Sequence, residues 1–389
     1  MQAAAVVARN YLPHARVLAE SFRRHHPDGR LALLIVDGAL DVPGADVLGP
    51  ADIGVDPLEL RRRAMLFDAQ GVISSLRAPL LAHLLDGPVL LLDADTLVLA
   101  PLDDLSELAA AEQILLSPHA LDPLPGGPGA WLEEEILRSG TFNGGFLGVG
   151  PGAEPFLAWM AERARRDCVR DPERGLLYTQ TWLNLVPALF PHHVLRDRGV
   201  NAQFHGLHGR DVEWAPAGPR IGADRLRLFH FTGFDPGEPE RLCRHYPGTE
   251  LADRPGLARL CREYAQRLRD EGWPAEPAPM GPEVDPVARS VYRHALLVSE
   301  AGRGLEPPDP AGPELAAWLG EAPPGTAVSR YLLGLHAARP ALRADFPRVP
   351  GADEDAYLGW AAGQAAEAEP EFPAAFASSA ARSAPATAR

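Results

Sequence analysis

The chain has 389 residues and a formal net charge of −15, and 46% of its residues are hydrophobic. This length predicts two or three domains with enough apolar side chains for full cores. The negative charge argues against a nucleic-acid partner, because phosphate backbones are held by clustered positive charge. No apolar run predicts a transmembrane segment, and the first residues lack the pattern of a signal peptide. We therefore expect a cytoplasmic protein.

The cysteine and lysine counts limit the kinds of catalytic and binding site that the chain can form. The three cysteines, Cys168, Cys243 and Cys261, lack the spacing of metal ligands and are expected to be reduced thiols. The chain contains no lysine, which excludes Schiff-base chemistry. Any cationic side chain that contacts a phosphate must then be arginine or histidine.

The N-terminal segment predicts a βαβ unit. We expect a strand at Ala3–Ala8, a helix from Pro13 to about His26, and a second strand at Leu31–Val36. Tyr11 lies where the first strand gives way to the helix. It can stack on a flat base there, or it can simply pack the loop.

Val89–Leu92 is a run of four apolar residues without a helical period, which predicts a strand buried on both faces. Asp93 and Asp95 follow it directly. A strand that turns out of the sheet can aim both carboxylates at one point, in the crevice where open α/β sheets bind ligands. Paired carboxylates there favour Mg²⁺ or Mn²⁺. The alternative is that both are solvated turn residues.

Three further segments carry candidate site residues. Arg77 lies near the break that Pro79 makes in a helical pattern from Ala64 to Leu85, and it either reaches the crevice of Asp93 and Asp95 or is solvated. Asn143 lies in the glycine-rich strand Thr141–Gly150, whose glycines permit close approach of a ligand or tight packing. His230 lies in the strand Leu228–Phe234. A lone strand histidine is more often a core residue, unless the two aspartates form a metal site.

The remaining predicted elements are mostly helical. They comprise a helix from Leu102, a strand at Ile114–Leu116, an exposed loop at Pro118–Gly129, and helices at Phe156–Ala164, at Tyr178–Asn184 ending by Pro187, and at Ala252–Asp270, Val287–Glu300, Glu314–Leu319, Val328–Ala338 and Glu354–Ala366. We predict an α/β domain over residues 1–247, a helical C-terminal domain over 248–372, and a disordered Ala/Ser/Pro-rich tail over 373–389.

Several of these segments, taken in order, resemble the retaining glycosyltransferases of the GT-A fold, the family 8 type that includes glycogenin and bacterial galactosyltransferases. The similarity covers about residues 1–246. It is carried by the following residues: Asn10-Tyr11, Arg77, Asp93-Ala94-Asp95, Phe142-Asn143-Gly144-Gly145, Gln180 and His230-Phe231-Thr232-Gly233. The region with Ser329–Leu333 and Phe346-Pro347 resembles a helical extension of bacterial members.

The resemblance implies a Rossmann-like mixed sheet and a role for each matched residue. Asp93, Asp95 and His230 would bind Mn²⁺ or Mg²⁺ on the diphosphate of a nucleotide-sugar, a UDP-sugar in this family. The implied donor-binding residues are Asn10, Tyr11, Arg77, Asp93, Asn143, Gly144, Gly145, Gly233 and Arg244. Gln180 and Asn143 would lie at the reacting carbon, and a hexose would pass with retention to an acceptor that the sequence does not identify.

The sequence departs from the family pattern at three places. Thr179-Gln180 stands where the family has Asp-Gln, so one carboxylate is missing. The lysine that follows the histidine motif in many members is absent, and Arg244 could replace it. The acidic position that reads uracil is Ala8 or Arg9, which leaves the nucleobase open.

Other functions remain possible from the residues. Asp93-Ala94-Asp95-Thr96 also fits phosphatases with an aspartate nucleophile, but these need a downstream lysine and an acidic pair that the chain lacks. A nucleotidyltransferase on a similar sheet would need a glycine- and Arg/Lys-rich loop after the first strand, and Ala8–Tyr11 is not one. A non-catalytic relative that binds nucleotide-sugars is the third alternative, because of Thr179.

Overall fold

The computed structural model describes residues 1–38, 40–124, 131–207, 210–246, 248–275, 289, 291–293 and 308–367. Contacts within the chain divide it into two compact units. Unit 1 comprises Met1–Val55 and Ala69–Met280, and unit 2 comprises Asp56–Asp68 and Gly281–Arg389. None of the helices in the described ranges is both long and apolar enough to cross a membrane.

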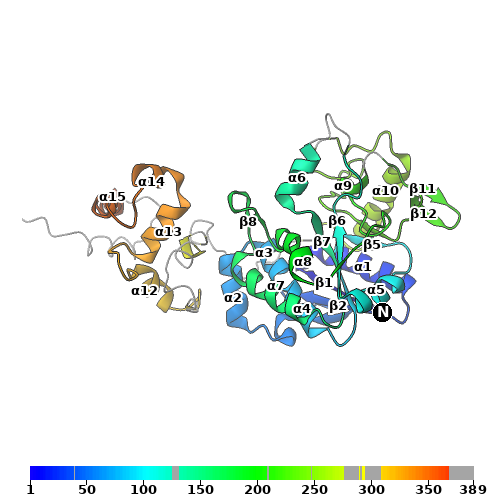
Figure 1. Cartoon of the computed structure of the whole chain (residues 1–389), viewed down its shortest axis with the longest axis horizontal. Coiled ribbons are helices and arrows are strands. Elements are labelled where there is room, and N and C mark those ends of the chain that lie inside the picture. Colours follow the sequence, from blue (N-terminus) through cyan, green and yellow to red (C-terminus); the bar gives the residue numbers. More distant parts are fainter. Residues whose placement is uncertain are drawn as a thin grey trace, which may run out of the picture. The chain divides into compact units, whose positions relative to one another are not determined.

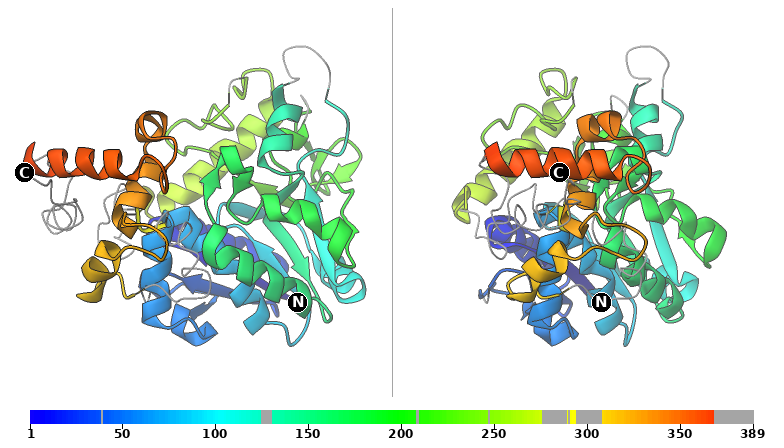
Figure 2. Two further views of the ribbon diagram at one scale, coloured as in Figure 1. Left: turned by 60° about the vertical axis from the view of Figure 1, so that its left-hand side comes forward. Right: turned by 90° about the vertical axis from the view of Figure 1, so that its left-hand side faces the viewer.

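Unit 1 is built on a seven-stranded mixed sheet with the order β10-β6-β7-β4-β1-β2-β3 (Figure 1). Its strands are β1 (Gln2–Val7), β2 (Arg30–Ile35), β3 (Asp46–Leu48), β4 (Val89–Leu92), β6 (Ile114–Pro118), β7 (Phe142–Val149) and β10 (His193–Val194). Neighbouring strands run parallel, except that β7 is antiparallel to both β4 and β6. The dark-blue strand β1 lies between β4 and β2 and can be followed in Figure 2. This sheet confirms the expected α/β class.

Helices cover both faces of the sheet, because its central strands are apolar on both sides. Alternate residues of β1, β2 and β4 pack in one cluster with α1 (Leu12–His25) and α5 (Asp103–Glu112). The opposite face meets α3 (Ala69–Ser75) and α4 (Arg77–His83), and α7 (Glu154–Asp167) packs against these two helices. The central strands therefore lie between two layers of helices.

A second apolar cluster of unit 1 surrounds a short two-stranded sheet. Strands β5 (Thr96–Val98) and β14 (Leu228–His230) pair antiparallel, and the cluster adds α10 (Pro255–Asp270). The other elements of unit 1 are η1 (Arg9–Tyr11), η2 (Pro50–Ile53), α6 (Trp131–Ser139), β8 (Arg170–Asp171), η3 (Pro172–Arg174), β9 (Leu176–Leu177), η4 (Thr181–Leu185), α8 (Val186–Leu189), α9 (Phe204–Leu207), β11 (Glu213–Ala215), β12 (Gly218–Ile221) and β13 (Asp224–Arg225).

Unit 2 is helical in its described part. It contains α2 (Pro57–Leu66), α12 (Glu314–Gly320), α13 (Arg330–Ala338), α14 (Pro340–Asp345) and α15 (Glu354–Glu367). The C-terminal helices share one apolar cluster in which Tyr357 is fully buried. Arg61 of α2 donates two hydrogen bonds, of 3.0 and 2.6 Å, to the Asp309 carboxylate. A segment early in the sequence thus belongs to the C-terminal unit.

The two units differ from the expected division of the chain. Unit 1 continues beyond residue 247, because Leu257, Leu260 and Tyr264 of α10 pack in the same cluster as Phe229 and Phe231. The α10 helix itself was expected, but as part of the C-terminal domain. The expected tail at 373–389 and most of the helix at Val287–Glu300 lie outside the described residues.

Several local predictions were wrong. The pattern at Ala64–Leu85 is helical and breaks near Arg77 as expected, but Pro79 does not make the break. The segment forms the end of α2 and two further short helices, and Pro79 fits into the first turn of α4. Pro187 likewise lies in the first turn of α8 and does not end a helix. The expected exposed loop at Pro118–Gly129 begins inside β6, and its second residue, His119, is buried. Residues 125–130 lie outside the described ranges.

Candidate active site

The candidate site lies at one edge of the central sheet. Strands β1, β4 and β6 run parallel in direction and end at this edge, and the antiparallel β7 begins there. Tyr11, Asp93 and His119 follow the three parallel strands, and Asn143 opens β7. Such an edge is where open α/β sheets bind ligands. A cleft of about 730 Å³ opens here.

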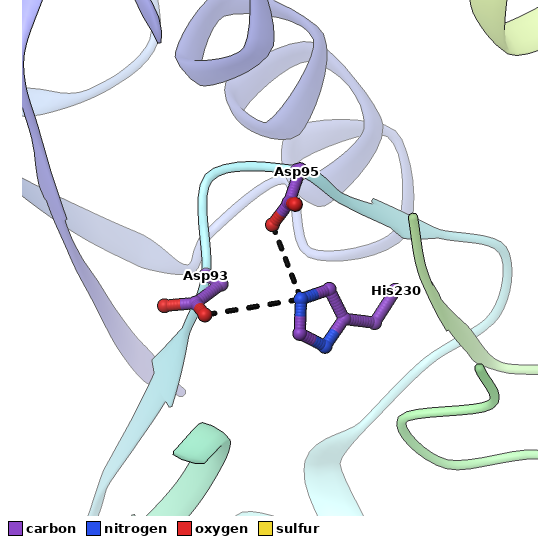
Figure 3. Close-up of side chains that lie close together, drawn as sticks. All are labelled: Asp93, Asp95 and His230. Carbon is purple, nitrogen blue, oxygen red and sulfur yellow. Dashed lines mark ion pairs between the residues drawn. The ribbon is translucent and has the colours of Figure 1, made fainter. Parts of the chain in front are cut away.

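Asp93, Asp95 and His230 converge in this cleft (Figure 3). One oxygen or nitrogen of each residue lies within 4.8 Å of the others. His230 Nε2 is 3.2 Å from Asp95 Oδ1 and 3.8 Å from Asp93 Oδ2. Residues 135 positions apart in the chain meet because β14 pairs with β5, immediately after the aspartates.

Backbone hydrogen bonds fix the two aspartates. The Asp93 N–H donates to the Gly145 carbonyl, at 2.9 Å, where β4 ends. The chain then turns at Ala94 and Asp95, and the Asp95 carbonyl accepts from the Phe231 N–H, also at 2.9 Å. The turn lets two aspartates at i and i+2 face one point, as expected for a strand that leaves its sheet.

The charges of the three side chains shift one another's pKa values. Burial raises the pKa of Asp93, and Arg77 and His230 offset this only in part. Burial also opposes ionisation of Asp95, but His230 outweighs it and lowers the pKa of that carboxyl. Burial acts against the charged form of His230, yet Asp95 and Asp93 raise its pKa. A proton on His230 thus supplies positive charge beside the carboxylates, where a divalent cation could supply it instead.

The donor set fits a divalent metal ion. Two carboxylates and an imidazole nitrogen suit Mn²⁺, and carboxylate oxygens also suit Mg²⁺. A Cβ on Gly145 would lie 2.2 Å from His230 Cε1 and 2.6 Å from its Nδ1. The imidazole therefore occupies the space that a side chain at residue 145 would fill. This explains one glycine of the Phe142–Gly145 segment.

Arg77 and Gln180 clamp the backbone of Gly144. Arg77 Nη1 donates to the Gly144 carbonyl at 2.7 Å, and Arg77 Nη2 also contacts Asp93 Oδ1. Gln180 Oε1 accepts from the Gly144 N–H at 2.9 Å, and Gln180 Nε2 donates to the Ser139 carbonyl at 2.9 Å. The amide oxygen of Gln180 is thus already hydrogen-bonded to β7, and Arg77 links β7 to Asp93 of the aspartate pair.

Tyr11 forms part of the cleft wall and is 40% exposed. Its ring stacks on His14, with ring centroids 4.6 Å apart. Burial of the hydroxyl and the charge of Asp95 raise the pKa of Tyr11 to about 12, so the phenol is neutral at pH 7. Burial lowers the pKa of His14 to about 4. A neutral aromatic side chain therefore lines the same cleft as the aspartates.

Most predicted site residues line this cleft. They are Tyr11, Arg77, Asp93, Asp95, Asn143, Gly144, Gly145, Gln180, His230 and Gly233. Asn10 and Arg244 are not among the lining residues. The exposed Arg244 side chain lies 3.9 Å from the Asp235 carboxylate, and its charge partly offsets the raised pKa of Tyr11.

Sequence reasoning missed several lining residues. Examples are His119, Glu135, Arg170 and Tyr246. His119 carried the same signal as Asp93, because it directly follows a buried strand that runs parallel to β4. The other three come from α6, β8 and a loop whose positions depend on tertiary packing, and no local pattern marks them.

Neither protein-family models nor curated proteins match the sequence. Solved glycosyltransferases are similar to it in structure. Galactosyltransferase LgtC in complex with donor and acceptor sugar analogs has 17% identity over 68% of this chain and 95% of that chain, with a TM-score of 0.40. Apo GlyE of Streptococcus pneumoniae TIGR4 has 16% identity over 71% of this chain and 64% of that chain, also at 0.40. Apo mouse xyloside xylosyltransferase 1 has 13% identity over 59% and 97%, at 0.34. Similarities this low assign no role to any residue.

Proposed function

We propose that the protein is a metal-dependent glycosyltransferase that moves a hexose from a nucleotide-sugar, most simply a UDP-sugar, to an acceptor. The convergence of Asp93, Asp95 and His230 in a large cleft carries this proposal. It is supported by the order in which the cleft residues occur in the sequence, which is the order of the family motifs. A cleft of about 730 Å³ falls in the size range of small-molecule and cofactor sites.

Asp93, Asp95 and His230 would hold Mn²⁺ or Mg²⁺. When bound, the ion supplies positive charge that stabilises the diphosphate as the sugar–phosphate bond breaks. Arg77 keeps Asp93 in place and holds the Gly144 carbonyl, so it aligns β7 with the aspartates. The exposed Tyr11 ring lines the same cleft as the aspartates and is suited to stacking on the nucleobase.

Gln180 is better suited to positioning than to nucleophilic attack. Its amide oxygen already accepts the Gly144 N–H, and its nitrogen donates to Ser139. Thr179 is buried beside it and offers no carboxylate. We therefore favour front-face attack by the acceptor, with the departing phosphate taking the acceptor's proton, and this route gives retention.

A nucleotide-sugar panel tests the proposal. The protein is incubated with Mn²⁺ and each donor, and free nucleoside diphosphate is measured. We expect turnover of one donor class, and proton NMR of fresh product should show the donor's anomeric configuration. An inverted product would contradict the retaining mechanism. Metal-dependent donor binding with no turnover on any acceptor would instead identify a non-catalytic relative.

A further inference from the structure

A buried histidine that the proposed reaction does not use lies in the wall of the cleft. His119 is 3% exposed and directly follows β6. Its backbone N–H donates to the Thr141 carbonyl at 2.9 Å. Its ring contacts Gly140 on one side and Asn143 on the other: Nδ1 is 2.8 Å from the Gly140 carbonyl oxygen, and Nε2 is 3.2 Å from Asn143 Nδ2.

The Gly140 carbonyl determines the tautomer of this ring. A carbonyl can only accept, so His119 Nδ1 must carry the proton and donate. Burial lowers the pKa of His119 to about 4, so the ring is neutral at pH 7. The other nitrogen, Nε2, then has only a lone pair. It can accept a hydrogen bond from Asn143 and cannot donate one.

The amide of Asn143 is oriented in the same way from its other end. Asn143 Oδ1 accepts from the Gly145 N–H at 2.8 Å, and a backbone N–H can only donate. It also accepts from Asn201 Nδ2 at 3.2 Å. Asn201 is 4% exposed and adopts φ 53°, a conformation rare for residues other than glycine. Two fixed backbone groups thus favour the same orientation of the Asn143 amide: Gly145 acts on it directly, and Gly140 acts through His119.

This orientation leaves one polar hydrogen of Asn143 for a ligand. Nδ2 carries two hydrogens, and in the described part of the chain only the one that meets His119 has a partner. Asn143 lines the cleft between Gly144 and the buried network. A flipped amide would present its carbonyl oxygen instead, which repels the oxygens of a phosphate because these can only accept hydrogen bonds.

We propose that His119 is a positioning residue that fixes the Asn143 amide so that an N–H, and not a carbonyl, faces an oxygen of the bound donor. His119 itself touches no substrate in this role. The inference deepens the proposed function and rests on it for its kinetic test.

Two substitutions separate the hydrogen bonds of this ring. The amide of His119→Asn can replace Nδ1 and keep the bond to Gly140, but it is too short to reach Asn143. The longer His119→Gln can replace Nε2 and accept from Asn143, but it loses the bond to Gly140. Each variant loses one buried hydrogen bond, so a purely structural role predicts similar melting temperatures and similar activity for both.

We expect the two variants to differ in kcat. His119→Asn should lower kcat about 3- to 10-fold, the range of one hydrogen bond, with unchanged affinity for UDP in the presence of Mn²⁺. His119→Gln should keep most of the wild-type kcat. In an Asn143→Ala background, His119→Asn should have no further effect on kcat. Equal losses in both variants, or a full His119→Asn effect in that background, would overturn the inference.

A second measurement does not depend on turnover. The side-chain amide protons of Asn143 can be assigned in a proton–nitrogen NMR spectrum by their disappearance in Asn143→Asp. His119→Asn should shift this amide pair, and His119→Gln should shift it less. Identical spectra for this pair in all three proteins would refute the inference. Absence of turnover in the wild type would refute only the proposed function, because the NMR result still tests whether His119 positions the Asn143 amide.

Discussion

Gly145→Ala should weaken metal binding although Gly145 contributes no ligand. The new methyl group would lie 2.2 Å from His230 Cε1, whereas ordinary contacts begin near 3.4 Å. The backbone at Gly145 cannot yield easily, because its carbonyl accepts from Asp93 and its N–H donates to Asn143 Oδ1. The imidazole must therefore move by about 1.2 Å, the difference between these two distances.

A displacement of this size disturbs one of three ligands. His230 Nε2 lies 3.2 Å from Asp95 Oδ1, and His230 is only 4% exposed. Changes to groups that orient a metal ligand typically cost about 10- to 100-fold in metal affinity. We expect a loss in this range for Mn²⁺, which corresponds to about 1.4 to 2.7 kcal/mol.

Isothermal titration of Mn²⁺ into protein without nucleotide measures this affinity directly. Gly87→Ala is the matched control, because a Cβ at Gly87 would meet nothing within 4 Å and its φ is not restricted to glycine. The control should bind Mn²⁺ as the wild type does. If Gly145→Ala folds and also binds Mn²⁺ with wild-type affinity, His230 is not a ligand as described here.

The other predictions concern the nucleobase, the clamp on β7 and pH. Tyr11→Ala should weaken UDP binding by about 1–3 kcal/mol in calorimetry, with Tyr11→Phe near wild type, and a loss of only a few tenths would make Tyr11 a packing residue. Gln180→Ala should lower kcat far more than donor affinity, because the loss of the hydrogen bond from the Gly144 N–H leaves β7 less well aligned. Equal effects on kcat and donor affinity would refute this. If the wild type binds donor but does not turn it over, Thr179→Asp should give slow donor hydrolysis. A Thr179→Asp variant that also fails to hydrolyse donor would contradict this prediction. The unfolded chain binds a proton at His14 between pH 6.5 and 4 and the folded chain does not, since burial lowers its pKa to about 4. The free energy of unfolding should therefore decrease as the pH is lowered from 6.5 to 4, by up to about 1.4 kcal/mol per pH unit. In urea unfolding, His14→Gln should show a weaker dependence on pH.

Local sequence signals sufficed where a buried strand meets a polar residue. Val89–Leu92 could be assigned as a strand because all four residues are apolar, and the structure buries each of them at 2% exposure or less. The placement of Asp93 and Asp95 at its end followed. That His230 joins them depends on pairing between β14 and β5, which no spacing in the sequence encodes.

The sequence was less informative where packing overrides local preference. Pro79 and Pro187 suggested helix breaks, but both fit into the first turn of a helix, where the backbone N–H that proline lacks would have no partner within the helix. The helix at Pro57–Leu66 has ordinary helix-forming residues, and nothing in its sequence indicates that it packs with the C-terminal unit. Its partner Asp309 is 248 residues away from Arg61.

Calorimetric titration of UDP with and without Mn²⁺ tests the central claim, that Asp93, Asp95 and His230 form a metal site that binds a nucleoside diphosphate. We predict that Mn²⁺ strengthens UDP binding to the wild type and that this gain disappears in Asp95→Asn, with the fold intact by circular dichroism. Equal UDP affinity with and without Mn²⁺ in the wild type would contradict the claim.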